Sequence, residues 1–271
     1  MRRRSIGWGL AGLICLVGCS DPKAKFGRTW YIDGAGNWGF GVFEVPEGLA
    51  DAGYKGAVTN HRWSLTLNPA LDQTLRFIAR GSGDLLGGEI TSYLKNNPGA
   101  EANIIGLSAG TGVGIWAIES VKPPYKVNNF VMVGSSLSNK YDVRKALANM
   151  KGNIYVYHSR SDPVLDGPVR ALGTIDGSFD DAAGLVGLRG PGAETGRVVN
   201  IPWSSKFASL GWTGGHTDCT NRTFVCKEIA CRIDSALGKG RTIASAPENA
   251  TVARPAPPAP PAASPAAASS R

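Results

Sequence analysis

A serine between two glycines points most directly to chemistry in this chain of 271 residues. Gly106-Leu-Ser108-Ala-Gly110 follows an apolar run, 102–107, and precedes a run of small residues, 111–120, that predicts a helix. A strand, a G-x-S-x-G turn and a helix in this order hold the serine in a strained conformation with its hydroxyl exposed. The sequence therefore predicts that Ser108 is a nucleophile.

The five-residue pattern alone is weak, because 36 glycines make a chance match common in a chain of this length. In the alternative interpretation, Ser108 only caps the following helix. The flanking residues favour the nucleophile. Ala109, Gly112 and Gly114 extend the small-residue run, so the helix can pack closely against its strand.

Strand and helix patterns alternate along the chain. The predicted strands are 29–33, 56–60, 103–107, 129–133, 153–157 and 197–201. The predicted helices are 70–79, 84–96, 111–120, 141–150 and 221–237. This alternation predicts an α/β fold with a mainly parallel sheet of about six to eight strands and helices on both faces. The active site of such a sheet lies at the carboxyl ends of its strands.

The stretch from Asp84 to Ser120 resembles the α/β-hydrolase superfamily, in which an amphipathic helix leads into the elbow strand. The resemblance covers most of the core and is specific only at the elbow. It implies a serine hydrolase whose catalytic residues follow the chain order Ser, then Asp or Glu, then His.

Three histidines are candidates for the general base. His61 precedes Ser108, which the superfamily order disfavours. His216 lies in a glycine-rich loop after the last predicted strand, where the superfamily places its base, and a loop lets the imidazole reach the serine hydroxyl. His158 closes a strand and is the alternative, although it fits a packed structural histidine equally well. We predict His216.

Two aspartates are candidates for the acid that orients the imidazole. Asp162 follows the strand at 153–157 and resembles the family's usual acid loop. Asp142 is the alternative, because some lipases of the superfamily carry the acid after the preceding strand. Either could be structural: Asp142 precedes a helical run and could cap it, and Asp162 precedes a proline and could start a turn. We predict a triad of Ser108, Asp162 and His216.

Acyl transfer also needs N–H donors for the oxyanion. The backbone N–H of Ala109, directly after the nucleophile, is the first. The segment 32–37 follows a strand and resembles the His-Gly-x motif of lipases with Asp33 in place of the histidine, which implies the N–H of Ala35 as the second. The departure at Asp33 leaves Gly36 and Asn37 as alternatives.

Aromatic residues flank both loops of the predicted site and favour an apolar acyl or alcohol group, unless they only pack in the core. They are Trp38, Phe40, Phe43, Trp203, Phe207 and Trp212. The stretch 167–196 is expected to form a small cap. These features favour a carboxylesterase or lipase-like hydrolase that needs no cofactor. Thioesterase, peptidase and polyester-degrading activities use the same triad. The alternative function is a non-catalytic envelope lipoprotein that uses the fold as a binding module.

The first residues resemble a bacterial lipoprotein signal peptide. Arg2–Arg4 precede an apolar stretch, 6–17, and Leu16-Val-Gly-Cys19 resembles a lipobox. The resemblance implies cleavage after residue 18 and acylation of Cys19, which would anchor the protein in the bacterial envelope. Ser20 favours the outer membrane. The alternative is an ordinary secretory signal.

The remaining chain divides into a short tether, 19–25, a catalytic domain, 26–243, and a tail rich in proline and alanine, 244–271, that is expected to be disordered. Loss of Arg2–Arg4 lowers the formal net charge from +8 to +5. The remaining charge forms no Lys/Arg cluster, so no nucleic-acid partner is predicted. The oligomeric state is left open.

Three cysteines fall in the predicted catalytic domain. Their spacing does not suggest a metal site. Export would permit a disulfide, and Cys219 with Cys226 is the more plausible pair. Cys226 and Cys231 share a predicted helix at a spacing that would distort it. Cys231 is then expected to be a buried thiol.

Overall fold

Six parallel strands form one sheet in the computed structural model, which describes residues 21–64 and 66–237. The strands are β1 (Arg28–Ile32), β2 (Ala57–His61), β3 (Ala102–Leu107), β4 (Phe130–Val133), β5 (Ile154–His158) and β6 (Val198–Pro202). Their order is β2-β1-β3-β4-β5-β6. The six predicted strands are confirmed to within one residue at each end. The strand order changes direction at β1 and β3, so a crevice is expected where these two strands end.

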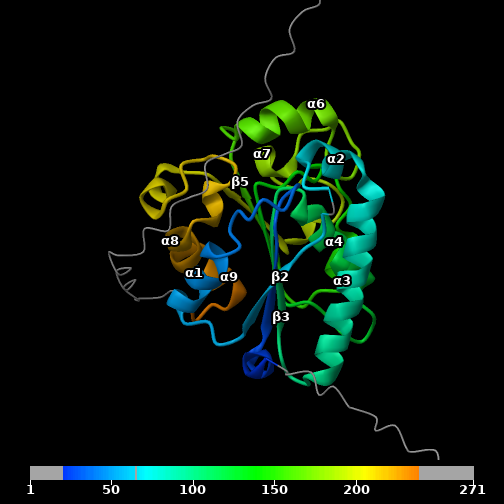
Figure 1. Ribbon diagram of the computed structural model, residues 1–271, viewed down its shortest axis with the longest axis vertical. Helices are drawn as coiled ribbons and strands as arrows, with labels where there is room; N and C mark the ends of the chain where they lie inside the picture. The colour runs from blue at the N-terminus through cyan, green and yellow to red at the C-terminus, as the bar shows by residue number, and fades with distance from the viewer. Residues whose placement is uncertain (1–20, 65, 238–271) are drawn as a thin grey trace, which may run out of the picture. The chain divides into compact units, whose positions relative to one another are not determined.

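Helices cover both faces of the sheet, as predicted (Figure 1). On one face lie α3 (Arg76–Asn96) and α4 (Gly110–Ser120), and on the other α1 (Glu44–Ala52), α8 (Arg222–Phe224) and α9 (Ala230–Ile233). Strands covered on both faces must be apolar along their length. Accordingly, all six residues of β3 are buried.

The predicted helices 70–79 and 84–96 are divided differently in the structure. A short α2 (Pro69–Thr74) is followed, after Leu75, by the long α3. Asn68 caps α2 by accepting hydrogen bonds from the amides of Ala70 and Leu71, at 3.0 and 3.2 Å. Gly81 and Gly83, which lie between the two predicted helices, are inside α3, where Gly83 allows close contact with α4.

The C-terminal helical segment carries the apolar stripe that its spacing predicts. Val225, Ile229, Ile233 and Leu237 are all buried. The segment is not a single α-helix, because a π-helical turn at Val225–Ile229 separates α8 from α9. The predicted helix at 141–150 is also shorter and consists of α5 (Arg144–Ala148).

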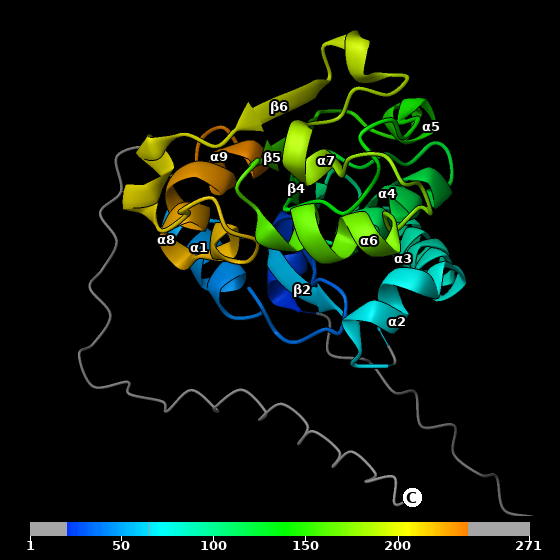
Figure 2. The same ribbon diagram turned by 90° about the horizontal axis from the view of Figure 1, so that it is seen from above.

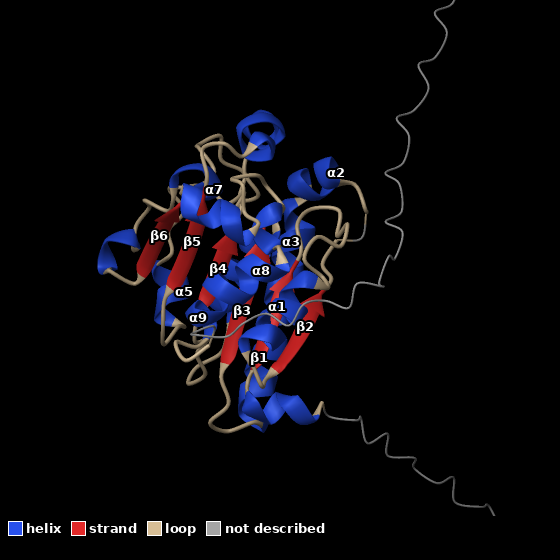
Figure 3. Ribbon diagram, turned by 90° about the vertical axis from the view of Figure 1, so that its left-hand side faces the viewer, coloured by secondary structure: helices blue, strands red, loops and turns tan. Residues whose placement is uncertain are grey.

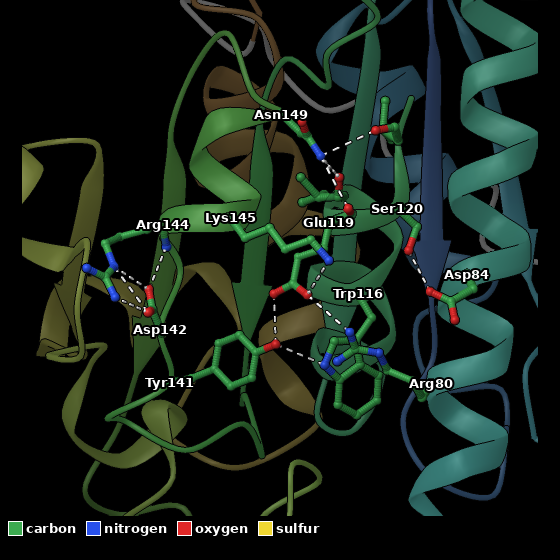
Figure 4. A network of polar contacts seen from close by, with 12 residues as sticks. Arg80, Asp84, Trp116, Glu119, Ser120, Tyr141, Asp142, Arg144, Lys145 and Asn149 are labelled. Carbon is green, nitrogen blue, oxygen red and sulfur yellow. Dashed lines mark hydrogen bonds and ion pairs between the residues drawn. The ribbon is translucent and has the colours of Figure 1, made fainter. Parts of the chain in front are cut away.

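A polar network fastens the end of α4 to its neighbours (Figure 4). The buried carboxylate of Glu119 accepts a hydrogen bond from the Tyr141 hydroxyl at 2.8 Å and faces Arg80 at 3.4 Å and Lys145 at 3.8 Å. The Asn149 amide donates to the carbonyls of residues 118, 119 and 121, at the C-terminal end of α4, where no further helical turn supplies amide donors. The network therefore fixes α4, whose other end carries the elbow.

Short helices lie beyond the carboxyl ends of the strands (Figure 3). They include α2, α6 (Arg170–Leu172) and α7 (Ala183–Val186), and they are also seen from above in Figure 2. In the described part of the chain, no helix is both long and apolar enough to cross a bilayer. The predicted signal peptide, Cys19, and the tail at 244–271 lie outside the described residues.

Candidate active site

Ser108 occupies a strained turn between β3 and α4. Its φ of +53° lies in the left-handed region, which is unusual for a residue other than glycine. The turn brings α4 so close to β1 that a Cβ at Gly110 would lie 2.4 Å from the Ile32 carbonyl oxygen. The glycine at this position is therefore required by packing, and the predicted elbow geometry is present.

The imidazole of His216 is paired with Asp162. His216 Nδ1 lies 2.7 Å from Asp162 Oδ2, and both side chains are largely buried. The other carboxylate oxygen, Oδ1, accepts hydrogen bonds from the amides of Val164 and Leu165 at 3.0 and 3.1 Å. These amides fix the carboxylate, so the orientation of the imidazole is fixed as well.

Ser108 and His216 line the same cavity, which has a volume of about 670 Å³. Its walls are formed by the glycine-rich loop that follows β1, the helix α2 and the segment 163–172. Its other lining residues are Gly34, Ala35, Trp38, Phe40, Asn68, Pro69, Ala70, Gln73, Leu107, Pro163, Val164, Pro168, Val169, Leu172 and Thr217. Among these lining residues there is no Asp, Glu, Lys or Arg. The cavity lining is therefore mostly apolar.

The loop after β1 passes directly beside the serine. A Cβ at Gly34 would lie 3.1 Å from Ser108 Cβ. The two alternative oxyanion donors are already used: the Gly36 amide donates to Asp72 Oδ2 at 2.6 Å, and the Asn37 amide donates to the Gly34 carbonyl at 3.2 Å. By contrast, the Ala35 amide has no acceptor in the described part of the chain.

Buried Asp33 holds this loop from within. Its carboxylate accepts hydrogen bonds from the amides of Gly34 and Gly39, both at 2.7 Å. Burial raises the pKa of Asp33, and these two amides oppose that rise. Asp33, which stands where the lipase motif has a histidine, thus helps to hold the conformation of the loop.

The alternative acid and base candidates lie in other surroundings. Asp142 is exposed and forms an ion pair with Arg144, which lowers the pKa of Asp142 to about 2 (Figure 4). His61 Nε2 lies 2.9 Å from the Ser82 hydroxyl. Half-buried His158, at the end of β5, does not line the cavity. The structure brings none of these three to the pair of His216 and Asp162.

The expectation that aromatic residues of both loops line the pocket holds for one loop only. Trp38 and Phe40 line the cavity. Phe207 and Trp212 instead stack on each other, with ring centroids 5.4 Å apart, in a buried cluster with Tyr157 and Phe224. Burial of aromatic surface stabilises this cluster, and the Trp212 indole N–H connects it to the His216 loop by donating to the Gly215 carbonyl at 3.2 Å. Of the predicted cap, 167–196, only Pro168, Val169 and Leu172 line the cavity, and they form one wall of it together with Pro163 and Val164.

The expected Cys219–Cys226 disulfide does not form in this structure. Cys219 is a buried thiol whose Sγ donates a hydrogen bond to the His216 carbonyl oxygen at 3.2 Å, so it is turned toward the histidine loop. Burial raises the pKa of Cys219 well above its ordinary value. Cys231 is only half-buried and contacts the Glu228 carbonyl. In the described residues, no cluster of metal-ligating side chains occurs.

Sequence reasoning missed two buried residues of α2 that border this site. Asp72 accepts a hydrogen bond from the Gly36 amide in the loop after β1, and the Gln73 side-chain amide donates to the Gly173 carbonyl at 3.0 Å, next to Leu172 of the cavity wall. Neither residue belongs to a recognisable motif. Their role depends on contacts with segments 36 and 100 positions away.

Comparison with solved structures finds similar folds at low sequence identity. A dienelactone hydrolase from Anabaena variabilis is 20% identical and covers 66% of this chain and 76% of its own, with a TM-score of 0.39. An acetylxylan esterase is 10% identical, covering 67% and 84%, with a TM-score of 0.39. A cutinase-like protein from Cryptococcus sp. is 12% identical, covering 76% and 94%, with a TM-score of 0.39. No family model and no curated protein matches the sequence.

The chain has an α/β-hydrolase fold. Its parallel sheet is covered by helices on both faces, and the strained serine follows the central strand β3. Asp162 follows β5 and His216 follows β6, so Ser108, Asp162 and His216 occur in the chain order that this fold implies.

Proposed function

We propose that this protein is a serine esterase that hydrolyses neutral, apolar carboxylic esters. One observation carries the proposal: Ser108, strained at the elbow, and His216, paired with Asp162, line the same mostly apolar cavity. A nucleophile, a base and an orienting acid are the parts that acyl transfer requires.

In the first half of the proposed reaction, Ser108 Oγ attacks the ester carbonyl while His216 Nε2 accepts the hydroxyl proton. Asp162 accepts the hydrogen bond of the Nδ1–H and stabilises the imidazolium without taking its proton. The amides of Ala35 and Ala109 stabilise the oxyanion of the tetrahedral intermediate. His216 then protonates the leaving alcohol, and an acyl-enzyme remains.

In the second half, a water molecule takes the place of the alcohol. His216 accepts a proton from this water as it attacks the acyl carbonyl, and the second tetrahedral intermediate releases the carboxylic acid. The proton returns to Ser108 Oγ. The two half-reactions are symmetric, so the same groups serve both.

The cavity supports a carboxylesterase or lipase-like preference. A charged acyl or alcohol group would have to leave water without a counter-charge, since the lining has no Asp, Glu, Lys or Arg. A volume of about 670 Å³ is large enough for a drug-sized apolar group. Neutral esters of medium chain length are therefore the expected substrates.

The test is reaction of the full-length protein, in detergent, with a fluorophosphonate probe and with p-nitrophenyl esters of graded chain length. The expected result is a single label on the peptide that contains Ser108, and turnover that is higher for medium-chain neutral esters than for a matched ester with a charged acyl group. Folded protein that takes no label would contradict the esterase and favour a binding module.

We further propose that the enzyme is attached to the bacterial envelope, in the outer membrane, by acyl chains on Cys19. The lipobox-like Leu16-Val-Gly-Cys19 supports this proposal. The change Cys19→Ala is expected to move the protein from the membrane fraction to the soluble fraction, while the matched change Cys15→Ala leaves it in the membrane fraction. Fractionation and mass spectrometry of the mature N-terminus measure both. Membrane retention of Cys19→Ala would contradict the tether.

A further inference from the structure

Two buried carboxylates, one directly after β1 and one on α2, accept hydrogen bonds from backbone amides of the glycine-rich loop that follows β1. Asp33, 4% exposed, accepts hydrogen bonds from the amides of Gly34 and Gly39. Asp72, 2% exposed, accepts a hydrogen bond from the amide of Gly36. The indole N–H of Trp63 donates to the Asp33 carbonyl at 2.8 Å and adds a fixed point at the start of the loop.

The loop needs such support because its glycine-rich backbone does little to restrict its own conformation. Gly36, Gly39 and Gly41 adopt positive φ angles of +85°, +90° and +79°, and Asn37 has a φ of +45°. Glycine in such a segment populates many conformations when nothing holds it, so ordering the segment costs conformational entropy. The carboxylates supply acceptors at fixed places along this segment.

Of the three consecutive backbone amides at 34–36, one remains available as a hydrogen-bond donor. The amides on either side of Ala35, those of Gly34 and Gly36, are held by Asp33 and Asp72, while the Ala35 amide has no acceptor in the described residues. Ala35 lines the cavity that contains Ser108.

We propose that Asp33 and Asp72 are positioning residues that clamp the loop on both sides of Ala35, so that its N–H is held ready for the oxyanion. This inference rests on the proposed esterase function. The carboxylates touch no substrate and act through the backbone of the loop. Preorganised donors of this kind stabilise a transition state because they need no rearrangement during the reaction.

The two carboxylates have different hydrogen-bond partners, so asparagine is expected to replace Asp72 but not Asp33. Both oxygens of Asp33 accept from backbone amides, which can only donate. In Asp33→Asn, the side-chain NH₂ must therefore face one of these N–H groups, and the hydrogen bond to that amide is lost.

Asp72 has one partner that can reverse its role. Its Oδ2 accepts from the Gly36 amide, but its Oδ1 accepts from the Thr66 hydroxyl at 2.7 Å. In Asp72→Asn, the amide oxygen can face Gly36 while the NH₂ donates to Thr66 Oγ1. The Thr66 hydroxyl then donates to the Asn68 carbonyl, 3.2 Å away. Asparagine thus preserves this clamp, and alanine removes it.

The experiment compares Asp33→Asn, Asp72→Asn and Asp72→Ala with the wild-type, full-length protein. We expect kcat to fall about 100-fold in Asp33→Asn and Asp72→Ala, with KM within about threefold of wild type, and kcat to stay within about threefold in Asp72→Asn. Asp84→Asn, which changes an exposed carboxylate on α3, is the matched control and is expected to behave as wild type.

Amide hydrogen exchange of the segment 33–40 gives a second readout that does not depend on catalysis. Exchange is expected to accelerate in Asp33→Asn and Asp72→Ala and to stay slow in Asp72→Asn. Unchanged exchange or unchanged kcat in Asp33→Asn would overturn the clamp, as would a loss in Asp72→Asn equal to that in Asp72→Ala. If the wild-type protein hydrolyses no ester, the proposed function fails, and the exchange data still decide whether the carboxylates hold the loop.

Discussion

Ser108→Ala is expected to lower kcat for ester hydrolysis by about 10⁵-fold or more, because it removes the oxygen that forms the acyl-enzyme. The fold should survive the change. Serine and alanine tolerate the positive φ at this position equally poorly, and the Ser108 side-chain hydroxyl has no hydrogen-bond partner in the described residues. We therefore expect the melting temperature to change by only a few degrees.

Turnover, fluorophosphonate labelling and thermal unfolding of Ser108→Ala should be measured together. The matched control is Ser82→Ala, which removes a serine hydroxyl on α3 that contacts His61 and lies outside the cavity lining. The control is expected to keep full labelling and turnover. Hydrolysis by folded Ser108→Ala at the wild-type rate would mean that another group attacks the ester, and the assignment of Ser108 would then be wrong.

The elbow could be predicted from sequence because its constraints are local. A buried strand, a turn with glycine at both ends and a helix of small residues occupy adjacent positions, 102–120, so their pattern is visible without tertiary information. The six strands were predictable for a related reason: strands of a parallel sheet that is covered on both faces form short apolar runs separated by polar segments.

The cavity wall could not be predicted in this way. Pro69 and Ala70 belong to α2, whereas Pro168 and Leu172 come from a segment about 100 positions later. No local pattern indicates that these segments meet over Ser108. The helix α1 was missed altogether, since Pro46 and Gly48 weaken its helical pattern, and it forms because its apolar side packs against the C-terminal helices.

The aromatic residues before His216 show the limit of composition as a guide. Trp212 could equally well line a pocket or fill a core, because its large apolar surface is stabilised by either environment. Trp212 lies in the core because it packs against aromatic rings of other elements, among them Tyr157 on β5, whose ring centroid is 5.9 Å away, and Phe224, at 5.1 Å. Such contacts join residues that lie far apart in the chain.

Asp162→Asn is expected to lower kcat by about 10⁴-fold with little change in the fold. The amides of Val164 and Leu165 will hold the asparagine oxygen where Oδ1 lies now, so the new NH₂ must point at His216 Nδ1. Nδ1 then accepts a hydrogen bond, and the proton moves to Nε2. In this tautomer Nε2 cannot accept the proton of Ser108, although every heavy atom remains in place.

The matched variant is Asp142→Asn, which changes the alternative acid. Asp142 is exposed and contacts Arg144 rather than His216, and an ion pair that is screened by water contributes little to stability. Asp142→Asn is therefore expected to keep kcat within about twofold of wild type. If Asp142→Asn is the damaging change and Asp162→Asn is mild, the acid assignment is wrong.

A variant that combines His216→Ala with Asp162→Asn tests whether the two residues act on the reaction together or independently. His216→Ala removes the base itself and should lower kcat by about 10⁵-fold or more, and groups that act as a unit have strongly non-additive effects. With the imidazole gone, Asp162 has nothing to orient, so His216→Ala combined with Asp162→Asn should be no slower than His216→Ala alone. If the two effects multiplied instead, Asp162 would act on the reaction by a route other than His216, which the 2.7 Å contact between them does not suggest.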